Sequence, residues 1–393
     1  TFHQQKAMSL QKLVRITTIP LSLEKLLEGQ LAYMQNHYQV IAVSAERERL
    51  EAFGVSEGIQ TKHVNLTRQI TPRKDIVAVY KLYKFLKKEK PQIVHSHTPK
   101  AGIVGMMAAY FAGVPHRLHT VAGLPLMEAT GFKRKILNFV EKLTYRFATK
   151  VYPNSQGLKD FIEAEEFVKP SKLKIIGQGS SNGIDTDYFS DTLFSTEEIL
   201  QKKKELKISE TDFVFIFVGR IVTDKGINEL VEAFVSLQKE KPNCTLLLVG
   251  PFEDTLDPVL PTTKKLIESH PKIISVGYQQ DVRVFFALSD VLVFPSYREG
   301  FPNVVMQAGA MALPAIVSNI NGCNEIVTHN KNGLIVPTKD VTSLFKSMQA
   351  LIANKERFLA LKANARNAIT SRYERQKIWE LLQEEYQSLL HNT

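Results

Sequence analysis

The sequence has few cysteines and lacks an apolar stretch long enough to cross a membrane. Its 393 residues include only two cysteines, Cys244 and Cys323, which are too few for a disulfide framework and have no metal-ligand spacing around them. We therefore expect a reducing cytoplasm as the compartment. The longest apolar run, from Ala101 to the residue before Pro115, has about 14 residues, whereas a membrane-spanning helix needs roughly 20.

Several other features are missing from the chain. Residues 1–11 are polar and basic without an apolar core, so we expect no signal peptide at this end. There is no low-complexity tract and no short-period repeat. We recognise no nucleic-acid-binding module, and aromatic residues are not interleaved with the basic ones, so nucleic acid is not an expected partner.

The net charge of +10 is carried by the first half of the chain. Residues 1–190 contain 27 Lys and Arg against 16 Asp and Glu, whereas residues 191–393 contain 23 against 24. Such charges can simply be solvated helix faces. Alternatively, they form a face held against anionic lipid headgroups, where each basic residue adds about 1 kcal/mol. The local basic runs are Lys81, Lys84, Lys87, Lys88 and Lys90, and Lys133, Arg134 and Lys135.

Apolar, β-rich segments alternate with helical patterns along the whole chain, which indicates α/β architecture with parallel sheets. The length is sufficient for two domains. Residues 190–210 are charged and lack a strand pattern, so they suit a linker and a short helix. The strands that we predict before this linker are 12–17, 38–44, 93–97, 117–121 and 150–152, and those after it are 213–218, 244–249, 273–276, 291–294, 315–317 and 334–336. We also expect Ser22 to cap a helix that begins at Leu23, and Pro302 to lie in the first turn of a helix that continues from Asn303 to Met311.

Two loops of the second half carry the residues with specific chemistry. The strand 213–218 is followed by Gly219-Arg220 and then by Lys225-Gly226, and the strand 291–294 is followed by Arg298-Glu299-Gly300. Arginine offers a planar fork to phosphate oxygens, and lysine offers a mobile point charge. A carboxylate repels phosphate, so we expect Glu299 to bind hydroxyl groups. Phosphate and sugar recognition at the carboxyl ends of strands describes a nucleotide-sugar site.

These loops resemble the motifs of the retaining glycosyltransferases of the GT-B fold, family four. The family's G-R-x-x-x-x-K-G pattern is complete from Gly219 to Gly226. Its second pattern has two glutamates separated by seven residues; here the first is Glu299, but the second position holds Gln307. Gln307 keeps hydrogen-bonding capacity but loses the charge. The resemblance implies two doubly wound Rossmann-like domains facing across a cleft.

The resemblance also implies roles for individual residues. Arg220 and Lys225 would bind the donor diphosphate, Glu299 would contact the transferred sugar, and position 307 would hold the ribose. Gly322 and Glu325 match the family's G-x-x-E segment, and the base is expected near Tyr278 and Gln279. The expected catalytic residues are Glu299, Arg220 and Lys225. The donor-binding set is Gly219, Arg220, Lys225, Tyr278, Gln279, Glu299, Gly300, Phe301, Pro302, Asn303, Val304 and Gln307.

The first half resembles bacterial enzymes that extend lipid-diphosphate-linked sugars. The matching segments are His97-Thr98-Pro99-Lys100-Ala101-Gly102, Lys133-Arg134 and Pro153-Asn154-Ser155. This implies an undecaprenyl-diphosphate-type acceptor, with His97, Lys100 and Gly123 on the acceptor side. Relatives often have His-Gly where this chain has Ala122-Gly123, so a histidine near the transferred sugar is missing. We expect a peripheral location on the inner face of the bacterial plasma membrane.

The expected domains are residues 1–190 for the acceptor and 191–374 for the donor, with a last helix at about 375–393 packing back on the first domain. No cofactor and no metal are expected, because the nucleotide sugar is a substrate. His95 and His97 share one face of a strand and could meet at a metal, but we identify no third ligand nearby. Asp185-Thr186-Asp187 resembles the metal-binding Asp-x-Asp of the other glycosyltransferase fold, although it lacks the preceding apolar strand.

We interpret the chain as a retaining transferase that moves a sugar from a UDP-sugar to a lipid-linked sugar. No convincing pair of carboxylates is present for double displacement. In the family, the leaving phosphate itself helps to deprotonate the acceptor. Two alternatives remain: a non-hydrolysing nucleotide-sugar epimerase of similar architecture, and a catalytically silent scaffold at the membrane. Gln307 and Ala122 give the scaffold some weight, whereas the Arg220, Lys225 and Glu299 pattern argues against the epimerase.

Overall fold

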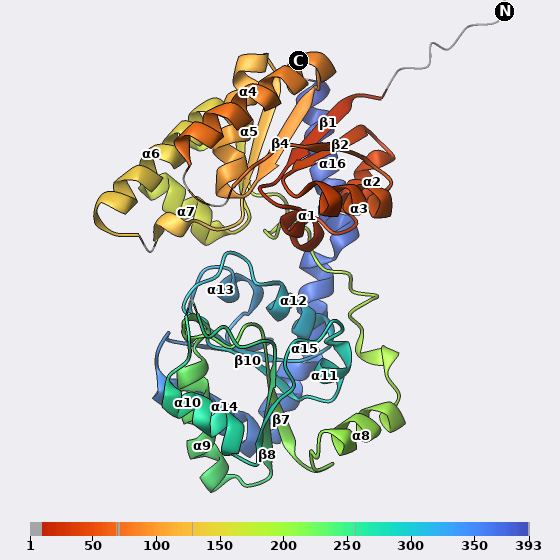
Figure 1. The fold of residues 1–393 in the computed structure, drawn as a ribbon. Coiled ribbons are helices and arrows are strands. Elements are labelled where there is room, and N and C mark those ends of the chain that lie inside the picture. The colour runs from red at the N-terminus through yellow and green to blue at the C-terminus, as the bar shows by residue number, and fades with distance from the viewer. Residues whose placement is uncertain (1–9, 68, 70, 128, 256, 392–393) are drawn as a thin grey trace, which may run out of the picture. The chain divides into compact units, whose positions relative to one another are not determined.

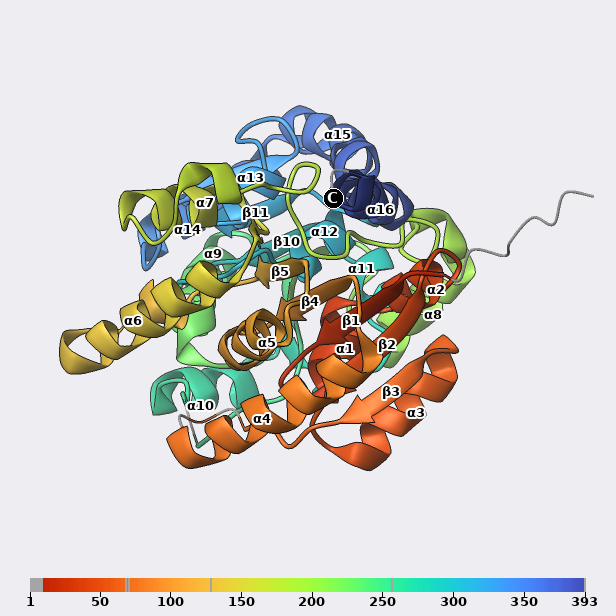
Figure 2. The same ribbon diagram turned by 90° about the horizontal axis from the view of Figure 1, so that it is seen from above.

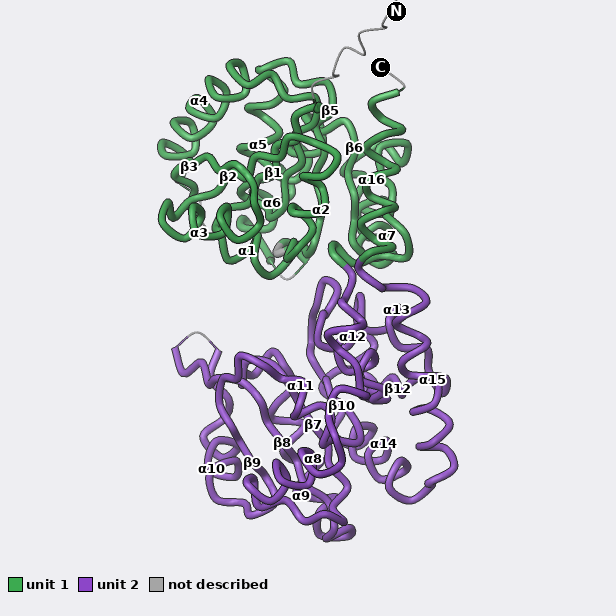
Figure 3. Tube along the Cα trace, turned by 90° about the vertical axis from the view of Figure 1, so that its right-hand side faces the viewer, with its two compact units in different colours: residues 1–182, 376–393 green, residues 183–375 purple. Residues whose placement is uncertain are grey.

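The computed structural model describes residues 10–67, 69, 71–127, 129–255 and 257–391. Residues 1–9 of the basic start and residues 392–393 of the predicted last helix lie outside these ranges. The chain divides into two compact units, residues 1–182 with 376–393 and residues 183–375 (Figure 3). Each unit contains one six-stranded sheet in which every strand pair is parallel. The prediction of two doubly wound α/β domains is therefore confirmed.

The sheet of unit 1 has the strand order β3-β2-β1-β4-β5-β6 (Figure 1). The chain first runs outward from β1 to β3 and then returns to pair β4 with β1. The strands are β1 (Lys12–Ile16), β2 (Gln39–Ser44), β3 (Gln60–His63), β4 (Ile93–His97), β5 (His116–Val121) and β6 (Lys150–Pro153). The helices are α1 (Pro20–Leu26), α2 (Gln30–Gln35), α3 (Arg47–Glu57), α4 (Pro72–Glu89), α5 (Pro99–Ala112), α6 (Gly131–Phe147), α7 (Gln156–Ala164) and α16 (Arg375–His391).

Alternating side chains of these strands feed two separate cores. On β1, Val14 and Ile16 join the core formed with α4, α5 and α7, whereas Leu13 joins the core formed with α1, α2, α3 and α16. This is the period of two that a strand imposes on its side chains. Figure 2 shows α5 and α16 on opposite faces of the sheet. Helix α16 buries Leu382 and Tyr386 in unit 1 although its sequence follows unit 2.

Two local predictions for unit 1 were wrong. The edge strand β3 was not predicted, because Gln60–His63 has no apolar alternation and leaves Gln60 and Lys62 exposed. The single helix predicted from Leu23 onward is two short helices, α1 and α2, separated by Gly29 with φ of +73°. Ser22 does not cap α1, which instead starts with Pro20 in its first turn.

The sheet of unit 2 has the order β12-β11-β10-β7-β8-β9. Its strands are β7 (Phe213–Val218), β8 (Cys244–Val249), β9 (Ile273–Ser275), β10 (Val291–Phe294), β11 (Ala315–Ser318) and β12 (Gly333–Val336). Its helices are α8 (Thr196–Glu205), α9 (Ile227–Glu240), α10 (Pro261–Ser269), α11 (Arg283–Ala287), α12 (Asn303–Ala310), α13 (Cys323–Ile326), α14 (Val341–Ala353) and α15 (Lys355–Tyr373). The central strands are buried throughout, as expected when helices cover both faces.

Every described helix is too short or too polar to span a bilayer, including the apolar α5. Several helices of unit 1 nevertheless carry exposed apolar side chains. On α4 these are Ile76, Val77 and Tyr80, and on α6 they are Phe132 and Phe139.

Glu141 on α6 should make the stability of unit 1 depend on pH. Its side chain is buried, its Oε2 atom has no hydrogen-bond partner, and burial raises its pKa from 4.5 to about 7. The folded protein therefore retains a proton that the unfolded chain releases, so stability is lost as pH rises from about 4.5 through 7. A shift of this size corresponds to about 3 kcal/mol. We expect Glu141→Gln to flatten the pH dependence of the unfolding free energy in urea melts.

The control for this prediction is Glu48→Gln on α3, where the side chain is exposed. That variant should keep the pH dependence of the wild type. An equally steep loss of stability between pH 5 and 8 in Glu141→Gln would contradict the prediction.

Candidate active site

The strand order of unit 2 reverses between β7 and β10. The chain proceeds from β7 to β8 and β9 on one side and then returns to place β10 on the other side of β7. In open α/β sheets, ligands bind beyond the carboxyl ends of the strands at such a reversal. The loop after β7 carries Gly219, Arg220 and Lys225, and the loop after β10 carries Glu299. Residues 74 positions apart are therefore brought to one edge of the sheet.

Close backbone packing brings these two loops together. A Cβ atom on Gly226, which has φ of +70°, would lie 2.2 Å from the carbonyl oxygen of Pro295 at the end of β10. A Cβ atom on Gly250, after β8, would lie 1.8 Å from the carbonyl oxygen of Gly219. Only glycine fits such approaches. The amide of Tyr297 also donates to the carbonyl of Asp224 at 2.8 Å, which joins the two loops directly.

Lys225 and Glu299 form an ion pair within this arrangement. The Lys225 ammonium contacts Glu299 Oε1, and both side chains are largely buried, with 16% and 18% exposed. Ser296 is fully buried, and its hydroxyl lies 3.2 Å from the same carboxylate oxygen. A cation and a carboxylate thus lie side by side where a strand end meets a helix start. The two residues can bind different parts of one ligand: the lysine can bind phosphate, and the glutamate can bind sugar hydroxyls.

The loop after β11 holds the backbone of the glutamate loop. The Asn321 side-chain amide donates to the carbonyl oxygens of Glu299 at 3.3 Å and Gly300 at 2.8 Å. Gly322 has φ of +74°, and a Cβ atom there would lie 2.5 Å from the Gly300 carbonyl oxygen. The sequence indicated Gly322 through its motif, but it did not indicate Asn321 or Ser296. Asn321 and Ser296 act through contacts between loops, and such contacts leave no pattern in the spacing of residues along the sequence.

Helix α12 begins directly after the glutamate loop. Pro302 is its N-cap residue, one position earlier than the first-turn position we predicted. Phe301 is buried against Tyr373, with ring centroids 5.3 Å apart. Asn303 is exposed, and Val304 and Gln307 are half-buried. The first N–H groups of a helix have no partner within the helix, so this start can bind an anionic oxygen.

The remaining predicted donor residues are more dispersed. Arg220 has an exposed side chain whose Nη1 lies 3.2 Å from Glu253 Oε2, so it is paired with a neighbouring loop rather than with Glu299. Tyr278 and Gln279 follow the edge strand β9, which β8 separates from β7. Tyr278 is 68% exposed, and the Gln279 amide donates to the Val276 carbonyl at 2.8 Å.

The nearby cysteine is not a nucleophile. Cys323 is fully buried on α13, and burial, reinforced by the negative charge of Glu299, raises the pKa of its thiol well above the usual value. The thiol therefore stays protonated at physiological pH. It packs beneath the ion pair as a small apolar side chain.

In unit 1, the predicted acceptor-side residues differ in burial and in their partners. Gly123 is half-buried after β5, and the Lys100 ammonium pairs with Asp75 Oδ2 at 2.5 Å, joining α5 to α4. His97 points into the core, where it is 1% exposed. His97 and Lys100 thus have different partners, and their assignment to the acceptor side stays a prediction.

The two metal hypotheses find no support among the described residues, which contain no group of three or more His, Cys, Asp or Glu able to hold a metal ion. Both ring nitrogens of His95 are engaged, Nδ1 with the Tyr386 hydroxyl at 2.5 Å and Nε2 with the Thr120 hydroxyl at 2.7 Å. Asp185 accepts the backbone N–H groups of Asp187 and Tyr188, so it stabilises a turn.

Comparison with known proteins matches both halves of the chain. The family model for glycosyl transferases group 1 matches residues 198–368, and the model for a glycosyl transferase 4-like domain matches residues 27–179. The capsular polysaccharide biosynthesis glycosyltransferase CapM of Staphylococcus aureus is 31% identical over 385 residues, which cover 98% of both chains. The Escherichia coli UDP-Gal:alpha-D-GlcNAc-diphosphoundecaprenol alpha-1,3-galactosyltransferase is 32% identical over 312 residues, 78% of both chains.

The fold also matches solved structures. The structure of Anabaena Alr3699/HepE in complex with UDP and glucose superposes with a TM-score of 0.80, covering 96% of this chain and all of that one. Its sequence is 18% identical, so the likeness concerns the fold.

Proposed function

The chain is a member of the family-four glycosyltransferases of the GT-B fold, and we propose that it transfers a sugar with retention from a UDP-sugar to a lipid-linked sugar during bacterial capsule or related glycan synthesis. The lipid-linked acceptor is supported by the name of the E. coli relative, which acts on a diphosphoundecaprenol-linked sugar. We assign donor binding to unit 2 and acceptor binding to unit 1.

The observation that carries this proposal is the Lys225–Glu299 pair at the strand reversal of unit 2. Both residues belong to complete or nearly complete family motifs, and they meet although they are distant in sequence. In the proposed complex, the donor diphosphate takes the place of the carboxylate beside Lys225 and also contacts Arg220. Glu299 then binds hydroxyls of the sugar that is transferred. The start of α12 lies next to this position and offers further N–H donors.

The proposed reaction needs no protein nucleophile. The bond between the sugar anomeric carbon and the diphosphate oxygen breaks, and a bond from the same face to the acceptor oxygen forms. The acceptor proton passes to an oxygen of the departing diphosphate. The chain contributes positioning and electrostatic stabilisation of the charge that develops on the leaving group.

We further propose that unit 1 docks on an anionic membrane surface. On α6, Phe132, Lys135 and Phe139 recur at i, i+3 and i+7 and therefore share one face, and all three are exposed. Phe132 and Phe139 are 78% and 66% exposed. Helix α4 adds the exposed Lys81, Lys84, Lys87 and Lys88. Exposed aromatic and basic side chains on a helix are typical of interfacial membrane binding.

Replacing the two phenylalanines by serine should weaken vesicle binding at least about 10-fold, because each inserted aromatic side chain contributes roughly 1.5 kcal/mol or more. Sedimentation with vesicles containing 30–50% anionic lipid measures this. Leu359→Ser, which alters an exposed apolar residue on α15 in unit 2, is the matched control and should bind as the wild type does. Equal vesicle binding by the double variant would remove α6 from the proposal.

The function is tested by nucleotide release from a panel of UDP- and GDP-sugars, with and without lipid-linked sugars extracted from bacterial membranes. We expect release from one UDP-sugar that depends on the extract, and a product whose anomeric configuration matches the donor by NMR. Conversion of the donor sugar without an acceptor would instead indicate the epimerase. Nucleotide binding without turnover, with extracts that another transferase accepts, would indicate the silent scaffold.

A further inference from the structure

Unit 1 contains a buried arginine with no acidic partner among the described residues that contact it. Arg15 on β1 is fully buried. Its Nη1 donates to the Tyr386 hydroxyl at 3.1 Å, and its Nη2 donates to Gln30 Oε1 at 2.8 Å and contacts His97 Nε2 at 2.7 Å. A buried charge without an ionic partner destabilises the folded state, so its presence indicates a functional role for the arginine.

The arginine fixes the proton position on His97. A guanidinium group carries only N–H donors, so His97 Nε2 must be the acceptor of their hydrogen bond. Burial, followed by the charge of Arg15, lowers the pKa of His97 well below its usual value, so the ring is neutral. A neutral imidazole that accepts at Nε2 carries its proton at Nδ1. This Nδ1–H group is buried and has no hydrogen-bond partner.

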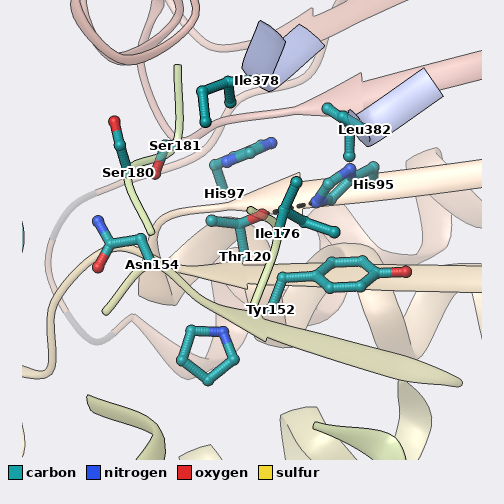
Figure 4. A pocket seen from close by; sticks show the side chains of 11 residues that line it. His95, His97, Thr120, Tyr152, Asn154, Ile176, Ser180, Ser181, Ile378 and Leu382 are labelled. Atoms are coloured by element: carbon teal, nitrogen blue, oxygen red, sulfur yellow. Dashed lines mark hydrogen bonds between the residues drawn. The ribbon is translucent and has the colours of Figure 1, made fainter. Parts of the chain in front are cut away.

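His97 lines a small cavity, and two other residues that line it carry buried polar atoms without partners. The cavity has a volume of about 20 Å³, and Figure 4 shows His97, Asn154 and Ser181 around it together with Ile378 and Leu382 from α16. Asn154 Oδ1 and Ser181 Oγ are buried atoms without partners. The cavity is therefore lined by apolar side chains and by three residues with unpartnered polar atoms, and the Asn154 amide is directed away from His97 (Figure 4). Its volume suits a single oxygen atom with its hydrogen.

The cavity lies where the fold of unit 1 places ligands. The strand order reverses between β1 and β4, as it does between β7 and β10 in unit 2, and His97 is the last residue of β4. The next residue, Thr98, has φ of +72° and ψ of +144°, a backbone conformation that is strongly unfavourable for a β-branched residue. The Thr18 backbone N–H donates to the Thr98 hydroxyl, and the hydroxyls of the two threonines share a second hydrogen bond, which together hold Thr98 there. Backbone strain that surrounding contacts maintain is typical of functional sites, and here the strained residue adjoins a residue that lines a polar cavity.

The arginine also organises the opposite wall of the cavity. Gln30, which accepts from Arg15, donates its side-chain amide to the Ser181 carbonyl and to Asn182 Oδ1, both at 3.1 Å. Ser180, in the same loop, adopts φ of +68°. One buried guanidinium thus orients both His97 and the loop 180–182.

We propose that this cavity binds one neutral hydroxyl group of the acceptor sugar, which accepts from His97 Nδ1–H, and that Arg15 is a positioning residue that fixes the His97 tautomer. A hydroxyl oxygen can accept this hydrogen bond and fits the cavity of about 20 Å³, whereas a whole phosphate exceeds that volume. This inference rests on the proposed function, because that function supplies the sugar.

The test uses two substitutions that separate the nitrogens of His97. The amide nitrogen of asparagine is bonded to Cγ, as Nδ1 is, whereas that of glutamine lies one bond further out, near Nε2. His97→Asn can keep the donor in the cavity, and His97→Gln cannot. We expect His97→Gln to raise the KM for lipid-linked acceptor 10- to 100-fold and His97→Asn to raise it less than about fivefold, with the KM for UDP-sugar unchanged in both.

The second measurement is side-chain ¹⁵N NMR of the histidines in the full chain, with and without GlcNAc linked to a short polyprenyl diphosphate as the probe. We expect His97 to be protonated at Nδ1 alone, its Nδ1–H signal to move on addition of the probe, and Arg15→Met to populate the Nε2–H tautomer. Protonation at Nε2 in the wild type would overturn the inference. The inference would also be overturned if the wild type binds the probe but the Nδ1–H signal of His97 does not move. The cavity would then hold only water.

The two proposals fail in different ways. If the wild type binds UDP but transfers no sugar to any acceptor in the membrane extract, the proposed function fails, and the NMR response to the probe still decides this inference. If transfer proceeds and both His97 variants raise the acceptor KM equally, the proposed function stands and the hydroxyl site is overturned.

Discussion

Arg220→Ala should lower kcat/KM for sugar transfer by about 30- to 1000-fold. Arg220 follows β7 at the strand reversal of unit 2, and its exposed guanidinium pairs with Glu253 of a neighbouring loop at 3.2 Å, a contact that a diphosphate can displace. Losing one charge-assisted contact to the leaving group costs about 2–4 kcal/mol of transition-state stabilisation. Initial-rate kinetics with the UDP-sugar that the wild type uses measures the effect.

The matched control is Arg357→Ala. Arg357 lies at the start of α15 and contacts Asn330 at 2.5 Å, remote from the loops after β7 and β10. This variant also loses one exposed arginine, but it should transfer sugar at nearly the wild-type rate. Near-normal turnover by Arg220→Ala would remove Arg220 from the catalytic set.

Glu299→Gln should lower kcat about 100-fold while the Kd for UDP changes little. Glutamine keeps the shape of the side chain and can still contact Ser296, but it removes the negative charge beside the transferred sugar. Lys225 keeps its charge, so it can still bind the diphosphate. Because UDP contains no sugar to be transferred, its binding reports on the diphosphate and the nucleoside alone. Single-turnover rates and UDP titration by calorimetry separate the two effects.

The second position of the two-glutamate motif, which holds Gln307, provides the comparison variant for the Glu299→Gln prediction. Gln307 is half-buried on α12. Gln307→Glu restores the residue typical of the family and should be tolerated if position 307 only holds the ribose. A wild-type kcat in Glu299→Gln, or a loss confined to the UDP Kd, would contradict the role that we give to Glu299.

Most strands could be predicted from the sequence because a strand buried between two helix layers is a short apolar run bounded by polar residues. The exceptions have physical reasons. Strand β3 lies at a sheet edge, where Gln60 and Lys62 face solvent, so its residues carry no apolar pattern. The division of one helical pattern into α1 and α2 depends on the left-handed conformation of Gly29, which periodicity does not reveal.

Those residues of the candidate site that lie in contiguous sequence motifs could be predicted. Arg220, Lys225 and Glu299 were found in this way. Ser296 and Asn321 were missed because each contacts a loop that another strand supplies, Ser296 through the Asp224 carbonyl after β7 and Asn321 through the Gly300 carbonyl after β10. Arg15 was missed for a related reason: within its strand it is one polar residue among apolar ones, and its partners come from α2, β4 and α16.

The sequence by itself determined that the chain alternates strands and helices twice, and which loops carry cations and a carboxylate, because these are local properties of a few adjacent residues. Only the tertiary structure decided that Lys225 meets Glu299, since that depends on β10 returning to the side of β7. It also decided that His97 faces inward to a cavity rather than outward with Lys100. The hydrogen bond from Arg15, on the neighbouring strand β1, fixes that histidine in place.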